Sequence, residues 1–188
     1  MQTFTPDDLE EDILADLMEE INELYESSEQ TLIELELRPE DNELQRALFR
    51  SIHTIKGDLG LVNFSPMIPL LQHVEDLLDY LRKGQVAYTS TMSDLVLLTM
   101  DRVKAFVEAV MANGKAEYDD NLHNQLVLAI GRVTPENTAE HEKRLTEAVL
   151  LLNPALDIVA DEDDPQNVQI KPPSLAATGI PKDISSEK

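Results

Sequence analysis

Apolar residues recur at spacings of three, four or eight along most of the first 150 residues of this chain. An α-helix turns once in about 3.6 residues, so this spacing gathers apolar side chains on one face. No long stretch alternates with a period of two, as a half-buried strand would. The pattern therefore predicts an all-α fold. The first stripe consists of Ile13, Leu17, Ile21, Leu24, Leu32 and Leu35.

The amino-acid composition favours the same fold. Hydrophobic residues make up 42% of the chain, but aromatic residues only 4%, and there is no Trp. The core must therefore consist mainly of Leu, Ile, Val, Ala and Met. Sheets are usually richer in β-branched and aromatic residues, so this composition favours packed helices.

Turn and cap signals divide residues 1–153 into six predicted helices. The first opens at Thr5-Pro6-Asp7-Asp8, with Thr5 as its N-cap, and runs to about Leu37. Short connections between long amphipathic helices favour antiparallel neighbours. We predict an up-and-down bundle with a four-helix core and one or two extra C-terminal helices. The second helix runs from about 42 to 65, the third ends at about 82, and the fourth runs from about 90 to 113. The fifth runs from 119 to 133 and the sixth from 135 to 152.

Residues 154–188 have a different character. They contain five of the ten prolines and the acidic run 161–164. Such a segment buries too little apolar surface to offset the entropy lost on ordering. The sequence predicts a disordered tail or linker here, following a domain at 1–153.

The net charge narrows the classes of partner. With 15 Lys and Arg against 37 Asp and Glu, the formal charge is −22. Binding to nucleic acid or to an anionic membrane needs the opposite sign, so neither is expected. The chain has no Cys and no apolar run of about 18 residues, and its N-terminus is acidic where a signal peptide would be basic. We therefore predict a cytoplasmic protein.

One histidine lies apart from the apolar face of the second predicted helix. At about 100° per residue, the apolar stripe of this helix centres roughly 130° away from His53. The histidine therefore points to solvent, with a cation, Lys56, one turn on. The residues on its side of the helix are Arg46, Arg50, Lys56, Gly57 and Gly60.

Gly57 and Gly60 follow His53 by one and two turns. Glycine inside a helix costs about 1 kcal/mol relative to Ala. Their lack of side chains leaves the imidazole open and lets another surface approach the helix. The alternative is that they only end the helix and that His53 is an ordinary surface residue.

The run His53-Thr54-Ile55-Lys56-Gly57 resembles the H-x-x-K-G signature of histidine phosphotransfer (HPt) domains. The longer run 48–57 is similar to the phosphoacceptor helix of the chemotaxis-kinase type of HPt domain, and Phe64 and Glu75 continue the match. The similarity extends over about residues 10–130 in helix order and is specific across 48–81.

This resemblance implies a phosphoryl carrier of a two-component phosphorelay. His53 accepts the phosphoryl group, Glu75 holds the proton on the other ring nitrogen, and Lys56 stabilises the transferring group. A response-regulator receiver domain or a sensor histidine kinase is the implied partner of a monomeric chain. The receiver brings its own Mg²⁺, so no cofactor or metal is expected in this chain.

Three positions depart from the family pattern. Asp58 and Leu59 follow the Lys-Gly pair, where HPt domains usually have small residues. The charge of Asp58 is expected to influence the choice of partner. On the third helix, Gln72 occupies the place of a second histidine found in many chemotaxis kinases, with His73 beside it.

Other functions remain open at this stage. The chain is either a free-standing carrier or the N-terminal phosphoacceptor module of a larger chemotaxis-type kinase; otherwise it is an acidic helical adaptor without catalytic function. A metal-dependent helical enzyme lacks an evident ligand set, because His73, His123 and His141 lie on separate predicted helices. No glycine-rich nucleotide loop is visible, so no kinase activity is expected from this chain alone.

Overall fold

A computed structural model describes residues 1–153 of the chain. The expected tail at 154–188 lies outside these described residues. The all-α prediction is confirmed, with six α-helices in the described part. Their bounds are α1 Glu11–Leu37, α2 Asn42–Leu61, α3 Ile68–Arg82, α4 Ser90–Asn113, α5 Asp120–Gly131 and α6 His141–Leu152.

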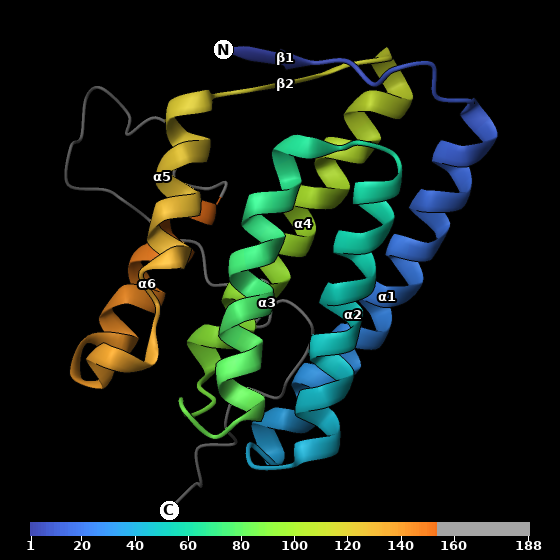
Figure 1. The fold of residues 1–188 in the computed structure, drawn as a ribbon. Helices are drawn as coiled ribbons and strands as arrows, with labels where there is room; N and C mark the ends of the chain where they lie inside the picture. The colour runs from blue at the N-terminus through green and yellow to red at the C-terminus, as the bar shows by residue number, and fades with distance from the viewer. Residues whose placement is uncertain (154–188) are drawn as a thin grey trace, which may run out of the picture.

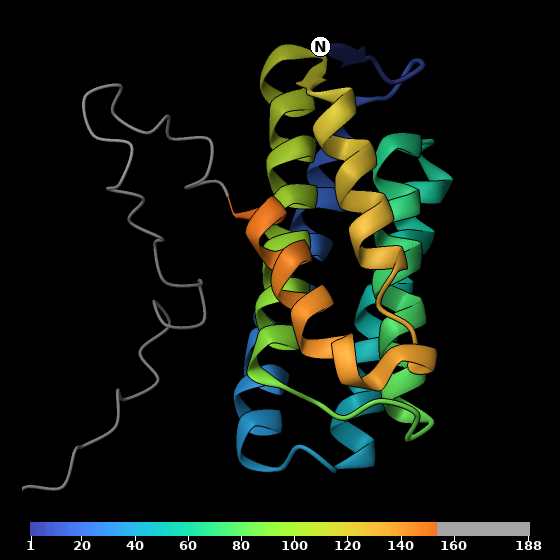
Figure 2. The same ribbon diagram turned by 90° about the vertical axis from the view of Figure 1, so that its left-hand side faces the viewer.

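Successive helices run in opposite directions, as the short connections predict. Helices α1 to α4 form a four-helix bundle in which α2 packs on α1 and α3, and α1 also packs on α4 (Figure 1). The two C-terminal helices form a second hairpin, with α5 against α3 and α6 against α4 (Figure 2). This hairpin lies away from α2, so it leaves the histidine helix uncovered. None of the helices among residues 1–153 combines the length and apolar character needed to cross a membrane.

Local signals set the ends of the helices. Asp41 caps α2, and its carboxylate accepts hydrogen bonds from the amides of Glu43 and Leu44. Thr89 caps α4 in the same way through the amide of Met92. Gly114 ends α4 at φ +69°, a left-handed conformation that glycine adopts without steric cost. Each of these caps depends only on residues that are close by in the chain.

The predicted start of the first helix is wrong. Residues Gln2–Phe4 form strand β1, which pairs antiparallel with β2, Ala116–Tyr118. Helix α1 begins only at Glu11, after Asp8 at φ +37°. The ring of Phe4 lies 5.1 Å from that of Phe64 and 5.3 Å from that of Phe106. This aromatic cluster at the end of the bundle requires an extended N-terminus, and local helix signals do not report it.

Two further sequence predictions need correction. Pro135–Glu140 form a 3₁₀ segment with a non-helical Asn137, so α6 begins at His141 instead of Pro135. Ile13 is 44% exposed, and Leu14 takes its place in the core. The helical stripe of α1 is therefore shifted by one residue at its first turn.

Three carboxylates join α1, α4 and α6 at one end of the bundle. Glu36 of α1 accepts hydrogen bonds from Tyr88, Ser90 and Ser93. Glu142 of α6 accepts one from Thr91. Burial, followed by repulsion from Glu36 and Glu142, raises the pKa of Asp94 from 3.8 to about 6. The ionised form of Asp94 is therefore disfavoured in the folded protein.

We expect Asp94→Asn to stabilise the domain at pH 7.5 by about 1 kcal/mol, or roughly 2–4 °C in melting temperature. Because folding raises the pKa of Asp94, the folded state binds this proton more tightly than the unfolded state does. Stability from this group is present below about pH 4 and is lost as the pH rises through about 6. Thermal unfolding at pH 7.5 and 4.5 measures the effect, which should be smaller at the lower pH. An equal gain at both values would contradict the assignment to Asp94.

Candidate functional site

His53 lies on α2 with 61% of its side chain exposed, outside the apolar face as predicted. Its Nδ1 atom faces the Glu75 carboxylate of α3, and Nδ1 and Oε1 are 3.2 Å apart. A carboxylate beside Nδ1 favours the imidazole tautomer that carries its proton on Nδ1. The other nitrogen, Nε2, then has a free lone pair. The ring is therefore set up to act as a nucleophile through Nε2.

Lys56 and His53 share the same carboxylate. The Lys56 Nζ atom lies 2.8 Å from Glu75 Oε2 and donates a hydrogen bond of 2.9 Å to Gln72 Oε1. Gln72 in turn donates to Asp76 Oδ1 at 2.9 Å. The structure thus brings together His53, Lys56 and Glu75, three of the residues that the sequence analysis singled out. It also places Gln72 in contact with Lys56. Gln72 stands where the family resemblance leads one to expect a second histidine.

Gly57 lies inside α2, four residues before its end, whereas Gly60 is the last residue but one, so the alternative that a glycine marks the helix end stands for Gly60. Both Gly57 and Gly60 are exposed, and a Cβ atom added at either would meet nothing within 4 Å. Neither residue has a positive φ. Neither position requires glycine for steric reasons, and at Gly57, inside the helix, this favours the hypothesis that the missing side chain lets another surface approach His53.

We expect Gly57→Ala to raise the free energy of unfolding by about 0.5–1 kcal/mol, because alanine is the better helix former and meets no clash. The same change should weaken the association of His53 with a docking protein, since it adds a methyl group to the open surface. Chemical denaturation measures the first effect and phosphoryl transfer the second. A stabilised variant with unchanged transfer would contradict the role of Gly57 in access.

Two residues near His53 were not singled out from the sequence. The Phe49 ring is nearly parallel to the imidazole, with an interplanar angle of 12° and 6.0 Å between ring centroids. The Arg82 guanidinium carbon lies 4.2 Å from the centre of the Phe49 ring. The spacing of four between Phe49 and His53 is a signal that they share a helix face. The approach of Arg82 depends on the packing of α3 against α2.

Asp58 faces α1 and not α3. Repulsion from Asp58 is the main cause of a raised pKa at Glu20, an exposed residue of α1. The Oδ2 atom of Asp58 is buried without a hydrogen-bond partner among the described residues. Asp58 therefore lies close enough to α1 to add to the negative charge there.

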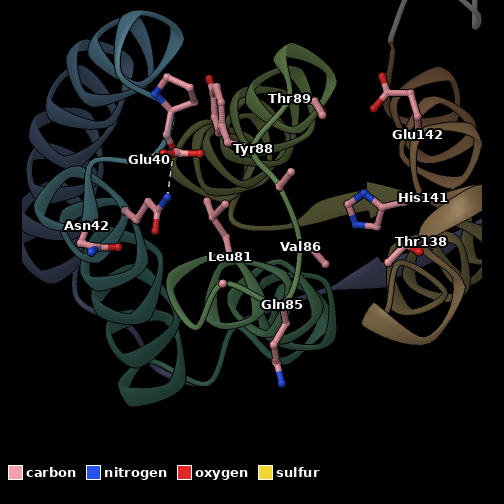
Figure 3. Close-up of a pocket in the computed structure, with 14 residues that line it drawn as sticks. Glu40, Asn42, Leu81, Gln85, Val86, Tyr88, Thr89, Thr138, His141 and Glu142 are labelled. Carbon is pink, nitrogen blue, oxygen red and sulfur yellow. Dashed lines mark hydrogen bonds between the residues drawn. The ribbon is translucent and has the colours of Figure 1, made fainter.

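A pocket among the described residues lies away from His53. It measures about 770 Å³ and is bordered by the α1–α2 turn, the α3–α4 connection and the start of α6 (Figure 3). Glu40, Val86 and His141 are among its lining residues, whereas His53, Lys56 and Glu75 are not. The histidine thus lies outside this pocket, on a surface where most of its side chain is exposed.

The other histidines do not form a metal site. His123 and His141 are buried, and burial lowers the pKa of both. His73 lies on α3, and its Nδ1 is 3.9 Å from Asp76 Oδ2. Among residues 1–153 no group of three or more His, Asp and Glu side chains could hold a metal ion.

Comparison with known proteins adds a family to this geometry. The Hpt domain family matches residues 12–111, more than half of the 188 residues. The sensor histidine kinase CheAY of Helicobacter pylori is 33% identical over 145 residues, which is 76% of this chain and 18% of that protein. The chemotaxis protein CheA of Halobacterium salinarum is 33% identical over 58% of this chain and 16% of its own length. The chain thus spans less than a fifth of these relatives.

Solved structures agree with this match. The CheA phosphotransferase domain from Thermotoga maritima is 32% identical, with a TM-score of 0.52, and the match covers 54% of this chain and 97% of that domain. A solution structure of the histidine phosphotransfer domain of CheA is 28% identical, with a TM-score of 0.54, over 64% of this chain and 92% of that domain. The match thus takes in nearly the whole of each solved domain.

Proposed function

This chain belongs to the Hpt domain family, and from this membership we infer that it carries phosphoryl groups on His53 in a two-component phosphorelay. The observation that supports this most directly is the contact between His53 Nδ1 and the Glu75 carboxylate at 3.2 Å, on a surface that is open to a partner. A purely scaffolding role does not require an exposed histidine whose Nδ1 atom faces a carboxylate that also pairs with a lysine.

The proposed reaction is a transfer between His53 and an aspartyl phosphate or a kinase-bound nucleotide. The Nε2 lone pair attacks phosphorus, an N–P bond forms, and the P–O bond to the donor breaks with its electron pair going to the leaving oxygen. The ring gains positive charge as it keeps its Nδ1 proton. The Glu75 carboxylate, 3.2 Å from Nδ1, stabilises that charge. The reverse steps pass the group to another aspartate.

Partners and cofactor follow from the same proposal. A receiver domain supplies the aspartate, the acidic pocket and its Mg²⁺, and a histidine kinase supplies ATP. This chain then needs no metal of its own and acts as a monomer in the cytoplasm. Its relatives are much longer, and a phosphoacceptor module within a chemotaxis-type kinase fits the proposal as well as a free carrier does.

The test is to incubate the purified chain with labelled ATP, first alone and then with a histidine kinase domain or a phosphorylated receiver domain. We expect acid-labile label on His53 only when the second protein is present. Label from ATP alone would show that this chain is itself a kinase. No label in any mixture would favour the acidic adaptor.

We expect Lys56→Ala to slow transfer about tenfold without preventing it. Removing one charge-assisted donor from a closed site costs up to a few kcal/mol, but this site is open to water until the partner docks. Lys56 is also held by Glu75 and Gln72, so only part of its charge acts on the phosphoryl group. Single-turnover kinetics measure the rate, with Lys83→Ala as the matched control. An unchanged rate would limit Lys56 to a structural role.

A further inference from the structure

Helix α3 reaches the His53 surface at two places. Glu75 contacts the imidazole directly through Nδ1. Seven residues later, the Arg82 guanidinium carbon lies 4.2 Å from the centre of the Phe49 ring. Residues seven apart lie on nearly the same face of a helix. The antiparallel packing of α2 and α3 therefore places Glu75 opposite His53, and Arg82 opposite Phe49.

Phe49 links Arg82 to the imidazole. It lies four residues before His53 on the same helix face, with the two rings nearly parallel at 12°. Phe49 is half-buried and packs on the core, whereas the His53 side chain is mostly exposed. The Glu75 contact fixes only the Nδ1 edge of the imidazole. The orientation of the ring plane depends on what lies beside it, and that neighbour is Phe49.

Arg82 is itself held in place by α3. Its Nε donates to Asp79 Oδ1 at 2.6 Å, and Lys83 Nζ lies 2.7 Å from Asp79 Oδ2. The hydrogen bond from Lys83 has the largest effect on Asp79, and Arg82 adds to it. Together they keep the pKa of Asp79 below its usual value, so Asp79 remains ionised. A guanidinium anchored in this way presents a flat cationic surface, which is well suited to an aromatic face.

We propose that Arg82 is a positioning residue for phosphoryl transfer at His53 and that it acts through the Phe49 ring. Arg82 holds Phe49 in one rotamer, and Phe49 keeps the imidazole plane aligned with Nδ1 toward Glu75 and Nε2 toward the partner. This proposal rests on the proposed function and adds two residues to its site. An exposed cation–π contact has a modest energy, so we expect Arg82→Ala to slow transfer about two- to fivefold.

The experiment compares Arg82→Ala, Phe49→Leu and their double variant in the full chain. Lys83→Ala is the matched control, because Lys83 shares Asp79 with Arg82, whereas the cation over the Phe49 ring is Arg82. Phosphoramidate, a small N–P donor that needs no partner protein, phosphorylates the imidazole directly. NMR of the product gives the ratio of Nε2 to Nδ1 phosphate. A phosphorylated receiver domain gives the transfer rate at saturating and at low concentration.

We expect Arg82→Ala to lower both the preference for Nε2 and the rate at saturating receiver, with little effect on the receiver concentration needed. The double variant should be no slower than Phe49→Leu alone, because Arg82 acts only through Phe49 and both changes interrupt the same contact. Arg82→Lys keeps the bridge to Asp79 but lacks the flat guanidinium, and should lose part of the rate.

Unchanged rates and an unchanged Nε2 preference in Arg82→Ala would overturn the proposal, as would additive effects in the double variant. If Arg82→Ala unfolds, the transfer rates of Arg82→Lys and Lys83→Ala are compared in its place. The proposal then requires Arg82→Lys to be the slower of the two. A failure of the proposed function gives a different result, because the wild-type chain would then accept no label from a kinase or receiver.

Discussion

His53→Gln is expected to abolish phosphoryl acceptance while leaving the fold intact. Glutamine has no nitrogen lone pair comparable to that of the neutral imidazole, so no N–P bond can form. The His53 side chain is 61% exposed and lies outside the core, so the change should alter the free energy of unfolding by less than about 0.5 kcal/mol. The measurement is acid-labile label from a kinase or phosphorylated receiver domain, together with a thermal melt.

The matched control for this prediction is His73→Gln. His73 is a partly exposed histidine on α3, with its Nδ1 facing Asp76 and not Glu75. We expect this variant to accept label at the wild-type level. Full labelling of His53→Gln, or loss of label in His73→Gln, would contradict the assignment of His53 as the acceptor.

Glu75→Ala should slow transfer about a hundredfold. The change removes the carboxylate that faces His53 Nδ1, so the imidazole loses both its tautomer preference and the charge that stabilises the ring as phosphorus is attacked. It also leaves the half-buried Lys56 with Gln72 as its remaining contact at 2.9 Å, which is expected to cost about 1–3 kcal/mol of stability. Single-turnover transfer and chemical denaturation measure the two effects separately.

Glu75→Gln distinguishes the hydrogen-bond acceptor at position 75 from the negative charge of its carboxylate. Its amide oxygen can still accept a hydrogen bond from the Nδ1–H group, so we expect a transfer rate between those of the wild type and Glu75→Ala. Asp76→Ala is the control on the same helix, because Asp76 contacts Gln72 and His73 but not His53. If Glu75→Ala transferred as fast as the wild type, the tautomer argument would be wrong, whatever the stability of the variant.

The helical fold and the exposure of the proposed acceptor histidine could be predicted from the sequence because both depend on short-range order. The period of 3.6 residues fixes which side chains share a face, so the exposure of His53 and the core position of Ile52, Ile55 and Leu59 followed from spacing alone. The helix ends near 82 and 113 followed from turn signals that act within a few residues. Spacing alone also placed Lys56 one turn after His53, whereas Glu75, and the roles of both residues, came from the family resemblance.

Tertiary packing decided what local patterns do not encode. Strand β1 exists because Phe4 packs between Phe64 and Phe106, which are 60 and 102 residues away in the chain. The pairing of Glu75 with both His53 and Lys56, and the approach of Arg82 to Phe49, depend on the register between α2 and α3. The sequence by itself determined the helices and the face that carries the histidine. Only the tertiary structure determined which side chains of a second helix surround that histidine, because contacts between helices depend on how whole apolar faces fit together.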